Sequence, residues 1–341
     1  MTIHELSKKI GYSASTISKV MNGYRGVSTA TREAVLAAVK QYDFVPNINA
    51  QSLMSKRSYM IGTLILDGPN DILSPHLSEI LNAFKTECTM HGYDITFLGN
   101  RMGKTEVTYR EHCIARNLDG LLLAVGMENL PSERTEQFEE LLRLDMPKVS
   151  VEGLHKDICT VISDNLSGSE YAIDYLYGLG HRKIGIVTVS GKNEASEQRL
   201  RGYRRCLKKH GIPEHPELIF PAAMYSYEAG KEIAEAVARH PEMTAVFCIY
   251  DEISIGLIAG LQERGIEVPR DLSLVSFDDI TAAQYSGLTT VRQNREKIGT
   301  IAARKLIAQI EDGTDTPKNN TFVDTKLVIR SSCRRIALSD D

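Results

Sequence analysis

Apolar side chains recur at helical spacing in three short segments of the first 45 residues. Ile3, Leu6 and Ile10 fall on one helical face of the first segment. A second segment starts near residue 14, and a third runs from about Thr29 to Tyr42. The pattern predicts three short helices. The inward positions of the second and third are Ile17, Val20, Met21, Val35, Ala38, Val39 and Tyr42.

Capping residues indicate where these helices begin and end. Thr2 and Glu5 form a capping-box pattern. Gly11 permits the positive-φ turn that ends the first helix, and Ser13 supplies an N-cap for the second. Two helices joined by a tight glycine turn and followed by a third are typical of a helix-turn-helix, whose second helix enters the major groove of DNA. The periodicity also allows a small helical bundle that binds another protein.

The pattern changes from residue 60 onward to alternating strand and helix, which predicts parallel sheets covered by helices. Two such sheets in succession form a two-lobed α/β body, and ligands of such folds bind beyond the carboxyl ends of the strands. We expect an N-terminal lobe of residues 60–159 plus 292–321 and a C-terminal lobe of 160–291 plus 322–341. The apolar runs are Met60–Leu66, Asp94–Leu98, Gly120–Val125, Lys148–Val151, Ile184–Val189, Ala245–Ile249 and Leu272–Phe277.

The stretch 46–59 joins the all-α helix-turn-helix domain, residues 1–45, to this body. Asn47 can cap a short helix in which Ala50, Leu53 and Met54 share one face. So short a helix is marginal in water and needs a partner. The sequence predicts a hinge helix or, alternatively, a plain linker.

Charge is divided unevenly along the chain. Residues 1–60 hold eight Lys and Arg against three acidic residues, whereas the remainder holds 32 against 41. A basic segment attached to an acidic body is typical of a module that binds a polyanion, although a solvated basic face would look the same. No apolar run approaches eighteen residues and no signal-peptide pattern opens the chain, so we expect a cytoplasmic protein without a membrane anchor.

The patterns of catalytic and metal sites are missing from the sequence. The six cysteines are scattered without a C-x-x-C pair, which favours reduced thiols over disulfides or a zinc site. H-E-x-x-H, G-x-S-x-G and the phosphate-loop motif do not occur. His210 and His215 lie five apart, with no nearby carboxylate or cysteine recognised as completing a metal set, and His181 is interpreted as a helix C-cap. We expect no catalytic residue, no cofactor and no metal.

The amino-acid sequence of the N-terminal segment resembles that of the lac repressor/GalR family of bacterial regulators. The resemblance rests on GYSASTISKVMNG at 11–23, Thr31-Arg32-Glu33 and YDFVPN at 42–47. It implies base contacts by Ala14, Ser15 and Lys19. Small residues at the outer N-terminal turn suit close approach to bases, and a lysine one turn later can reach a guanine edge or a phosphate. The implied phosphate contacts are Ser13, Thr16, Ser18 and Asn22.

The same resemblance gives the hinge a role. It implies that the segment becomes helical on DNA, with Asn47, Ala50 and Leu53 at the family's positions and Leu53 inserted into the minor groove as a wedge. Such wedges partly unstack a base step and bend the duplex.

The body resembles periplasmic sugar-binding proteins through motifs such as Gly180–Ile184, Phe277-Asp278-Asp279 and Leu327–Ser332. Polar groups at strand ends are the candidate effector contacts. A planar guanidinium suits bidentate hydrogen bonding and a carboxylate can accept two sugar hydroxyls. The resemblance implies that Arg199 and Asp278 are the foremost direct contacts, with Tyr250 and Glu152 next. His76 stands where the family often has an aromatic cluster, and the chain has no Trp to stack on a sugar ring. The full set is His76, Glu152, Arg199, Tyr250, Asp251 and Asp278, with a structural role as the alternative for Asp251.

These expectations combine into a homodimeric transcriptional regulator, interpreted as a repressor. It would bind a pseudo-palindromic, double-stranded operator and respond to a small-molecule effector such as a sugar. Two other classes remain open: a regulator controlled by a protein corepressor, as in catabolite control, and a solute-binding transport protein. The second should carry a signal peptide and no basic helical segment, which is the reverse of this sequence.

Overall fold

The computed structural model describes residues 1–21, 23–45, 57–65, 75–124, 132–151, 153–155, 157–190, 194–313 and 319–337. The chain divides into two compact units, Met1–Tyr59 and Met60–Asp341. In the described parts no helix is both long and apolar enough to cross a membrane.

The first unit holds the three predicted helices, α1 (Ile3–Ile10), α2 (Ala14–Met21) and α3 (Thr29–Gln41). The predicted caps are confirmed. Thr2 and Glu5 form a capping box, Gly11 ends α1 at φ +73°, and the backbone N–H of Thr16 donates to Ser13 Oγ at 3.0 Å. Val39 and Tyr42, predicted as core, are only partly buried, and Phe44 completes the core instead. That core is Leu6, Ile17, Val20, Val35 and Phe44.

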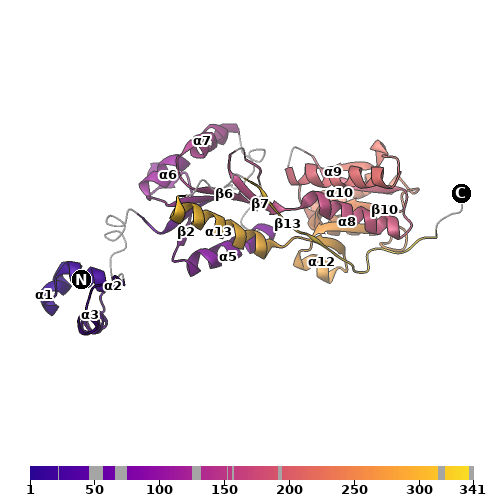
Figure 1. The fold of residues 1–341 in the computed structure, drawn as a ribbon. Helices are drawn as coiled ribbons and strands as arrows, with labels where there is room; N and C mark the ends of the chain where they lie inside the picture. Colours follow the sequence, from indigo (N-terminus) through magenta and orange to yellow (C-terminus); the bar gives the residue numbers. More distant parts are fainter. Residues whose placement is uncertain are drawn as a thin grey trace. The chain divides into compact units, whose positions relative to one another are not determined.

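The second unit contains two six-stranded sheets, each covered by helices on both faces (Figure 1). The first sheet has the order β13-β7-β6-β5-β1-β2 and is parallel throughout. We call this sheet and its helices lobe 1. Its strands are β1 (Met60–Leu64), β2 (Asp94–Phe97), β5 (Gly120–Leu123), β6 (Lys148–Val151), β7 (Cys159–Ser163) and β13 (Thr321–Val323).

The helices of lobe 1 lie in two layers. In Figure 1, α13 runs beside α5 on one face of the sheet, and α6 and α7 cover the other face. A two-stranded ribbon, β3 (Arg101–Met102) with β4 (Thr105–Glu106), lies apart from the sheet in the topology. The helices are α5 (Pro75–Met90), α6 (Tyr109–Ala115), α7 (Ser132–Arg143) and α13 (Arg295–Asp312).

The second sheet, with its helices, forms lobe 2 and has the order β14-β12-β11-β10-β8-β9. Only β14 runs antiparallel to its neighbour. The strands are β8 (Ile184–Val189), β9 (Ile219–Ala222), β10 (Ala245–Cys248), β11 (Ser273–Asp278), β12 (Thr289–Arg292) and β14 (Lys326–Val328). The helices are α8 (Asn165–Gly178), α9 (Glu194–Lys209), α10 (Tyr227–Ala238), α11 (Asp251–Gln262) and α12 (Thr281–Tyr285).

Three segments of the described chain connect the lobes, between β7 and α8, β12 and α13, and β13 and β14. They bring distant parts of the sequence to one place, beyond the carboxyl ends of the parallel strands. The first sheet contains the whole of β7, Cys159–Ser163, which the sequence-based division splits after residue 159. It also contains all of β13, which that division splits after residue 321.

The apolar runs do not mark every strand. Five strands of the two sheets, β7, β9, β12, β13 and β14, carry no such run. In β7 and β12 the buried positions include hydroxyl side chains, because Thr160, Ser163, Thr289 and Thr290 are fully buried. A criterion based on apolar side chains therefore misses β7 and β12.

His181 does not cap α8 as a charged residue. Its ring is fully buried, with Nδ1 3.0 Å from Thr244 Oγ1 and Nε2 3.1 Å from the carbonyl oxygen of Arg334. Burial lowers the pKa of His181, which favours the neutral ring. The backbone N–H of His181 donates to the carbonyl oxygen of Leu176 at 3.1 Å, so the residue does cap the end of α8, while its buried ring joins Thr244, just before β10, to the C-terminal segment.

Candidate functional site

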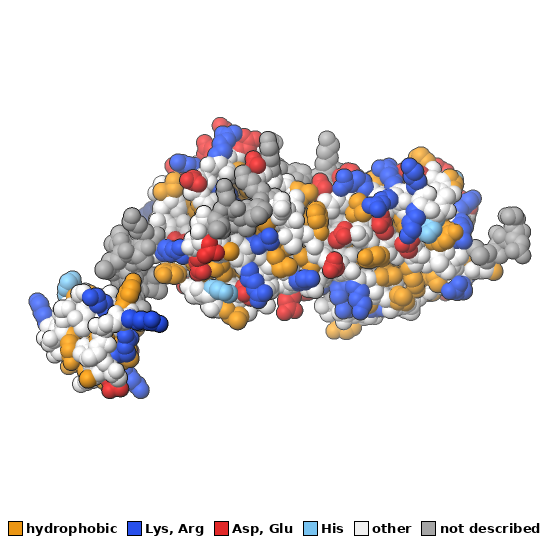
Figure 2. All heavy atoms as spheres, in the orientation of Figure 1, with side chains coloured by type: hydrophobic (Ala, Val, Ile, Leu, Met, Phe, Trp, Pro, Cys, Tyr) orange, Lys and Arg blue, Asp and Glu red, His pale blue; other side chains and the backbone are white. Residues whose placement is uncertain are grey.

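The N-terminal turn of α2 presents small polar side chains to solvent. Ile17 and Val20 are buried on the other side of the helix and thereby set its orientation in the first unit. Ser13, Ser15 and Lys19 are exposed, and Ala14, Thr16 and Ser18 are partly exposed. Lys and Arg side chains appear at several points on the visible surface of this unit (Figure 2). The residues expected to contact DNA therefore lie on the accessible side of the helix, except Asn22, which lies outside the described residues.

Arg32 fixes the end of α2, a role that the sequence analysis did not assign. Its guanidinium donates to the carbonyl oxygen of Tyr24 at 2.8 Å and to that of Val20 at 3.4 Å. The segment after the candidate recognition helix is thereby attached to α3. In the sequence, the Thr31-Arg32-Glu33 motif is the feature that could have indicated this role of Arg32.

Several expected contacts fall outside the described residues. These are the hinge residues Asn47, Ala50 and Leu53, and Glu152 of the effector set.

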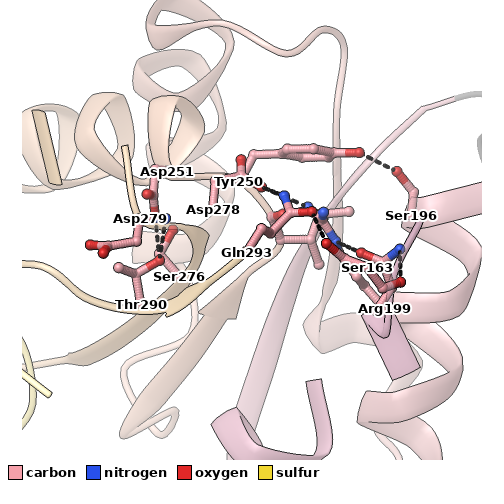
Figure 3. Close-up of polar contacts among 12 residues, drawn as sticks. Ser163, Ser196, Arg199, Tyr250, Asp251, Ser276, Asp278, Asp279, Thr290 and Gln293 are labelled. Carbon is pink, nitrogen blue, oxygen red and sulfur yellow. Dashed lines mark hydrogen bonds and ion pairs between the residues drawn. The ribbon is translucent and has the colours of Figure 1, made fainter. Parts of the chain in front are cut away.

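Arg199 is the centre of a buried polar cluster in lobe 2 (Figure 3). It lies on α9 and is 2% exposed. Its Nε donates to Asn165 Oδ1 at 2.8 Å and its Nη1 to the carbonyl oxygen of Ile249 at 2.6 Å. The guanidinium carbon lies 4.7 Å from the ring centroid of Tyr250 and 3.7 Å from that of Phe277, so the planar guanidinium makes cation–π contacts with two aromatic rings.

Asp278 meets this guanidinium from the end of β11. Its Oδ1 lies 3.4 Å from Arg199 Nη1 and accepts a hydrogen bond from Gln293 Nε2 at 2.6 Å. Ser163 Oγ in turn donates to Gln293 Oε1 at 2.6 Å. Ser163 is the last residue of β7, where one connecting segment begins, and Gln293 lies in the segment between β12 and α13. The cluster is therefore linked by hydrogen bonds to two of the connections between the lobes.

Electrostatics at Asp278 depend on both lobes. Burial raises the pKa of this carboxyl, while Arg199, then His76, Gln293 and Arg295 act to lower it. His76 lies in the first turn of α5, on lobe 1. The predicted residues Arg199, Asp278 and His76 are therefore brought to one electrostatic neighbourhood.

Asp278 and Asp279 both have left-handed backbone, at φ +121° and +56°. Such conformations cost on the order of 1–3 kcal/mol each and persist where surrounding contacts enforce them. Arg295 supplies those contacts, because its Nη1 donates to the carbonyl oxygen of Asp278 at 2.6 Å and its Nη2 to that of Asp279 at 3.1 Å. Its Nε reaches Glu79 on α5 at 2.7 Å, so this arginine joins lobe 1 to the end of β11.

Asp279 points to the other side of the strand end. It accepts from Arg292 Nε at 2.5 Å and from Arg330 Nη2 at 2.6 Å. A pocket of about 500 Å³ lies on this side and takes residues from both lobes. Its lining includes Glu79, Asp279, Arg292, Gln293, Arg295 and Asp324.

Asp251 stands behind the cluster as a supporting residue. It is fully buried, and its two oxygens accept from Thr290 Oγ1 at 2.7 Å and from the backbone N–H of Ile280 at 2.9 Å. Burial raises the pKa of Asp251 to about 7, with the charge of Asp278 as the next cause. This geometry favours the structural alternative for Asp251 over effector contact.

Tyr250 borders the cluster opposite Phe277. Its hydroxyl is 3.1 Å from Ser196 Oγ, and its ring meets Tyr225 edge-on with centroids 4.7 Å apart. Asn165, Gln293, Ser163 and Arg295 were not predicted as site residues. Their partners lie 15 to 216 residues away in the sequence, so no local pattern shows which group each side chain meets.

The expectation that no carboxylate or cysteine lies near His210 is wrong. His210 does lie beside a carboxylate and a cysteine, because α8 and α9 run side by side and bring Asp174 to Cys206 and His210. Cys206 lies four residues before His210, so their spacing could have suggested that the two side chains meet. Asp174 lies 36 residues before His210, and no local spacing indicates that contact.

Comparisons with known proteins match both units. Residues 2–47 match the model for bacterial regulatory proteins of the lacI family, and residues 173–333 match that of a periplasmic binding protein-like domain. The HTH-type transcriptional repressor PurR of Vibrio vulnificus (strain CMCP6) is 28% identical over 98% of this chain and 99% of its own length.

Solved structures agree with this picture over nearly the whole chain. A complex of the transcriptional regulator CelR with cellobiose is 26% identical at a TM-score of 0.70, covering 97% of this chain and 99% of its own. A lac repressor dimer bound to operator and the anti-inducer ONPF is 23% identical at a TM-score of 0.82, covering 98% and 99%, which shows the shared fold.

Proposed function

The chain belongs to the lacI family of bacterial regulatory proteins, and we propose that the buried Arg199–Asp278 cluster is its effector site. The protein is a DNA-binding transcriptional repressor controlled by an effector, and it is not an enzyme. In our proposal α2 contacts operator bases through Ala14, Ser15 and Lys19, and phosphates through Ser13, Thr16, Ser18 and Asn22. The protein acts in the bacterial cytoplasm in this proposal, because the chromosome lies there.

The connection between Asp278 and the segments that join the lobes carries this proposal. Asp278 contacts Gln293, Gln293 contacts Ser163, and Arg295 holds the strand end from the lobe 1 side. A ligand that changes the position of Asp278 therefore acts on two connecting segments at once. Such a ligand shifts operator affinity only if it prefers one arrangement of the lobes.

Polyhydroxylated molecules suit the chemistry of the site. The distance of 3.4 Å between Arg199 Nη1 and Asp278 Oδ1 exceeds the roughly 2.7–2.9 Å of a tight charge-assisted hydrogen bond. A hydroxyl can donate to the carboxylate and accept from the guanidinium, so a sugar or sugar-like metabolite would satisfy both charges. The similar CelR protein was solved with cellobiose, which supports this class. His76, Tyr250 and Glu152 would complete the contacts.

We further propose a homodimer on a pseudo-palindromic operator, since a two-fold protein matches two half-sites. The lac repressor of similar fold was solved as a dimer bound to operator. Within this proposal Asn47, Ala50 and Leu53 form the hinge contact with the minor groove.

The test is an operator-binding titration with a panel of sugars and nucleosides, using Asp278→Asn and a matched control. The substitution keeps the acceptor for Gln293 but removes the charge, so we expect the effector midpoint to rise by roughly tenfold or more while operator affinity without effector is unchanged. Asp312→Asn, an exposed carboxylate at the end of α13, should behave as wild type. An unchanged effector midpoint in Asp278→Asn would remove this residue from the site.

The same assay separates the protein-corepressor alternative. Under that alternative no small molecule in the panel changes operator affinity, whereas added phosphocarrier protein increases it.

A further inference from the structure

A second polar cluster lies between α8 and α9, on the face of lobe 2 that these helices cover. Asp174 projects from α8, Cys206 from the last turn of α9, and His210 directly follows the end of α9 at Lys209. Asp174 Oδ1 is 2.5 Å from His210 Nε2 and accepts from Cys206 Sγ at 3.2 Å. In the described part of the chain, these three side chains bring one oxygen, one sulfur and one nitrogen within 4.8 Å of one another.

The surroundings hold each of these groups in a defined orientation. The His210 ring stacks on Tyr177 with centroids 3.8 Å apart and planes at 16°, and Arg182 lies over that tyrosine at 3.8 Å. Lys209 Nζ donates to both oxygens of Asp174, to Oδ2 at 2.8 Å and to Oδ1 at 2.9 Å, so Oδ1 faces the lysine as well as the cysteine and histidine. Ligating carboxylates and imidazoles in metal sites are oriented by neighbours in this way.

The dimensions of the cluster match a small tetrahedral ion. With a Zn–S bond of about 2.3 Å and Zn–N and Zn–O bonds of about 2.0 Å, tetrahedral ligands are separated by roughly 3.3–3.5 Å. The Sγ–Oδ1 distance of 3.2 Å is already close to this value. The Oδ1–Nε2 distance of 2.5 Å has to open by less than about 1 Å, and Sγ and Nε2 lie within 4.8 Å of each other.

Burial leaves one side of the cluster open. Cys206 is fully buried, whereas the side chains of Asp174 and His210 are 35% and 18% exposed. An ion held by all three would thus keep a coordination position toward solvent. Three protein ligands and one open position are a familiar arrangement for Zn²⁺.

We propose that Asp174, Cys206 and His210 form a binding site for a divalent transition metal of the zinc class. A thiolate and an imidazole favour borderline-soft ions over Mg²⁺ and Ca²⁺, which prefer oxygen ligands. The site lies on the same helix pair as the Asn165–Arg199 contact, two helical turns along α9 from Arg199.

Two features of the metal-free protein oppose metal binding: the proton on Cys206 and the positive charge of Lys209. Burial, followed by the hydrogen bond to Asp174, raises the pKa of the Cys206 thiol to about 12, so the metal has to displace a proton. Lys209 also places a positive charge on Asp174. Its removal should therefore strengthen metal binding, whereas a purely structural ion-pair cluster gives no such expectation.

Cobalt is the probe of choice, because thiolate-bound Co²⁺ gives a near-ultraviolet charge-transfer band and tetrahedral Co²⁺ gives intense visible bands. We expect both on titration of the full-length, reduced, chelator-stripped protein, saturating at one equivalent per chain and abolished by Zn²⁺. Cys206→Ser should eliminate the charge-transfer band, while Cys333→Ser, at a partly buried thiol outside the cluster, should retain it. Absence of the band in the wild type, or its persistence in Cys206→Ser, overturns the proposal.

Further variants separate loss of the site from loss of the fold. His210→Gln should weaken Co²⁺ binding, and His215→Gln, at a partly exposed histidine five residues further on, should not. Lys209→Ala should bind Co²⁺ about two- to five-fold more tightly than Lys208→Ala, the value of an exposed ion pair expressed as affinity. Operator binding equal to that of wild type shows that each variant is folded. Equal Co²⁺ affinity of His210→Gln and wild type would contradict the ligand set.

Discussion

Two neighbouring aspartates at the end of β11 serve different partners because the backbone turns them apart. Asp278 faces Arg199 and Gln293, whereas Asp279 binds Arg292 and Arg330. Left-handed φ values at both residues make this division possible, and Arg295 stabilises them through their carbonyl oxygens. A local backbone feature thus decides which carboxylate is available to an effector.

At α2, we predict that Lys19→Ala weakens binding to the preferred operator by about 1–3 kcal/mol and relaxes specificity at one base position. The side chain is exposed one turn beyond the N-terminus of the helix, where it can reach a base edge. Fluorescence anisotropy with a set of single-base operator variants measures both effects. Lys40→Ala, exposed near the end of α3, is the control, and a uniform loss over all sequences would make Lys19 a phosphate contact instead.

At Asp251, we predict a pH-dependent contribution to stability. Its pKa is raised from 3.8 to about 7 in the folded protein, so the folded state holds the proton more firmly than the unfolded chain. The contribution of this carboxyl to the free energy of unfolding therefore falls as pH rises from about 4 to about 7. Urea unfolding of the wild type and Asp251→Asn across this range measures the difference.

The asparagine variant should lose that part of the pH dependence. The difference in stability between the two proteins should therefore change with pH, with the wild type favoured most near pH 4 and least near pH 7. Identical pH profiles for the two proteins would show that Asp251 does not titrate in this window. Asp312→Asn, with its exposed side chain, serves as the control.

On the scale of elements, helix packing in lobe 2 depends on glycine. An ideal Cβ on Gly256 of α11 would lie 1.9 Å from the carbonyl oxygen of Tyr227, and one on Gly230 of α10 would lie 2.1 Å from that of Ile253. The two helices therefore approach so closely that their backbones leave no space for a methyl group at these positions.

We predict that Gly256→Ala destabilises the protein by at least about 1–3 kcal/mol, because backbone atoms have to move apart. Gly178→Ala is the matched control, since Gly178 is also helical and a Cβ there meets nothing within 4 Å. It should be neutral or slightly stabilising through helix propensity. Chemical denaturation compares the two variants, and similar midpoints would contradict the close approach of α10 and α11.

Helices were more predictable than strands in this chain. The capping residues Thr2 and Ser13 determine helix starts through hydrogen bonds within four residues, so local sequence suffices. Strands such as β7 and β12 depend on neighbours supplied by distant segments. Their buried threonines and serines become recognisable only when the sheet has formed.

For the whole molecule, regulation requires the body to act on the DNA-contacting unit through the hinge. We predict that Leu53→Ala weakens specific operator binding about tenfold or more while effector binding to the body is unchanged, because the wedge contributes only on DNA. Operator anisotropy and effector thermal shift, measured on the same preparation, give the two values. Met54→Ala, the neighbouring apolar residue, is the comparison, and unchanged operator affinity in Leu53→Ala would end the wedge hypothesis.

The candidate effector residues were found from sequence because polar residues at strand ends converge in parallel sheets. Asp278 ends β11 and follows that rule, whereas Arg199 lies on α9, the helix after β8, and the resemblance placed both first. Their positioning partners did not follow from it. Ser163 and Gln293 lie 130 residues apart, yet they share a hydrogen bond, and Asn165 meets Arg199 across 34 residues.

The sequence by itself determined the three N-terminal helices, the alternation of strand and helix, and the family motifs, because these depend on residues a few positions apart. Only the tertiary structure decided which side chains meet across the lobes and between α8 and α9. Arg295 with the carbonyl oxygen of Asp278 and Asp174 with His210 are such pairs. These contacts arise when helices and strands pack, and no spacing along the chain encodes the distance between their ends.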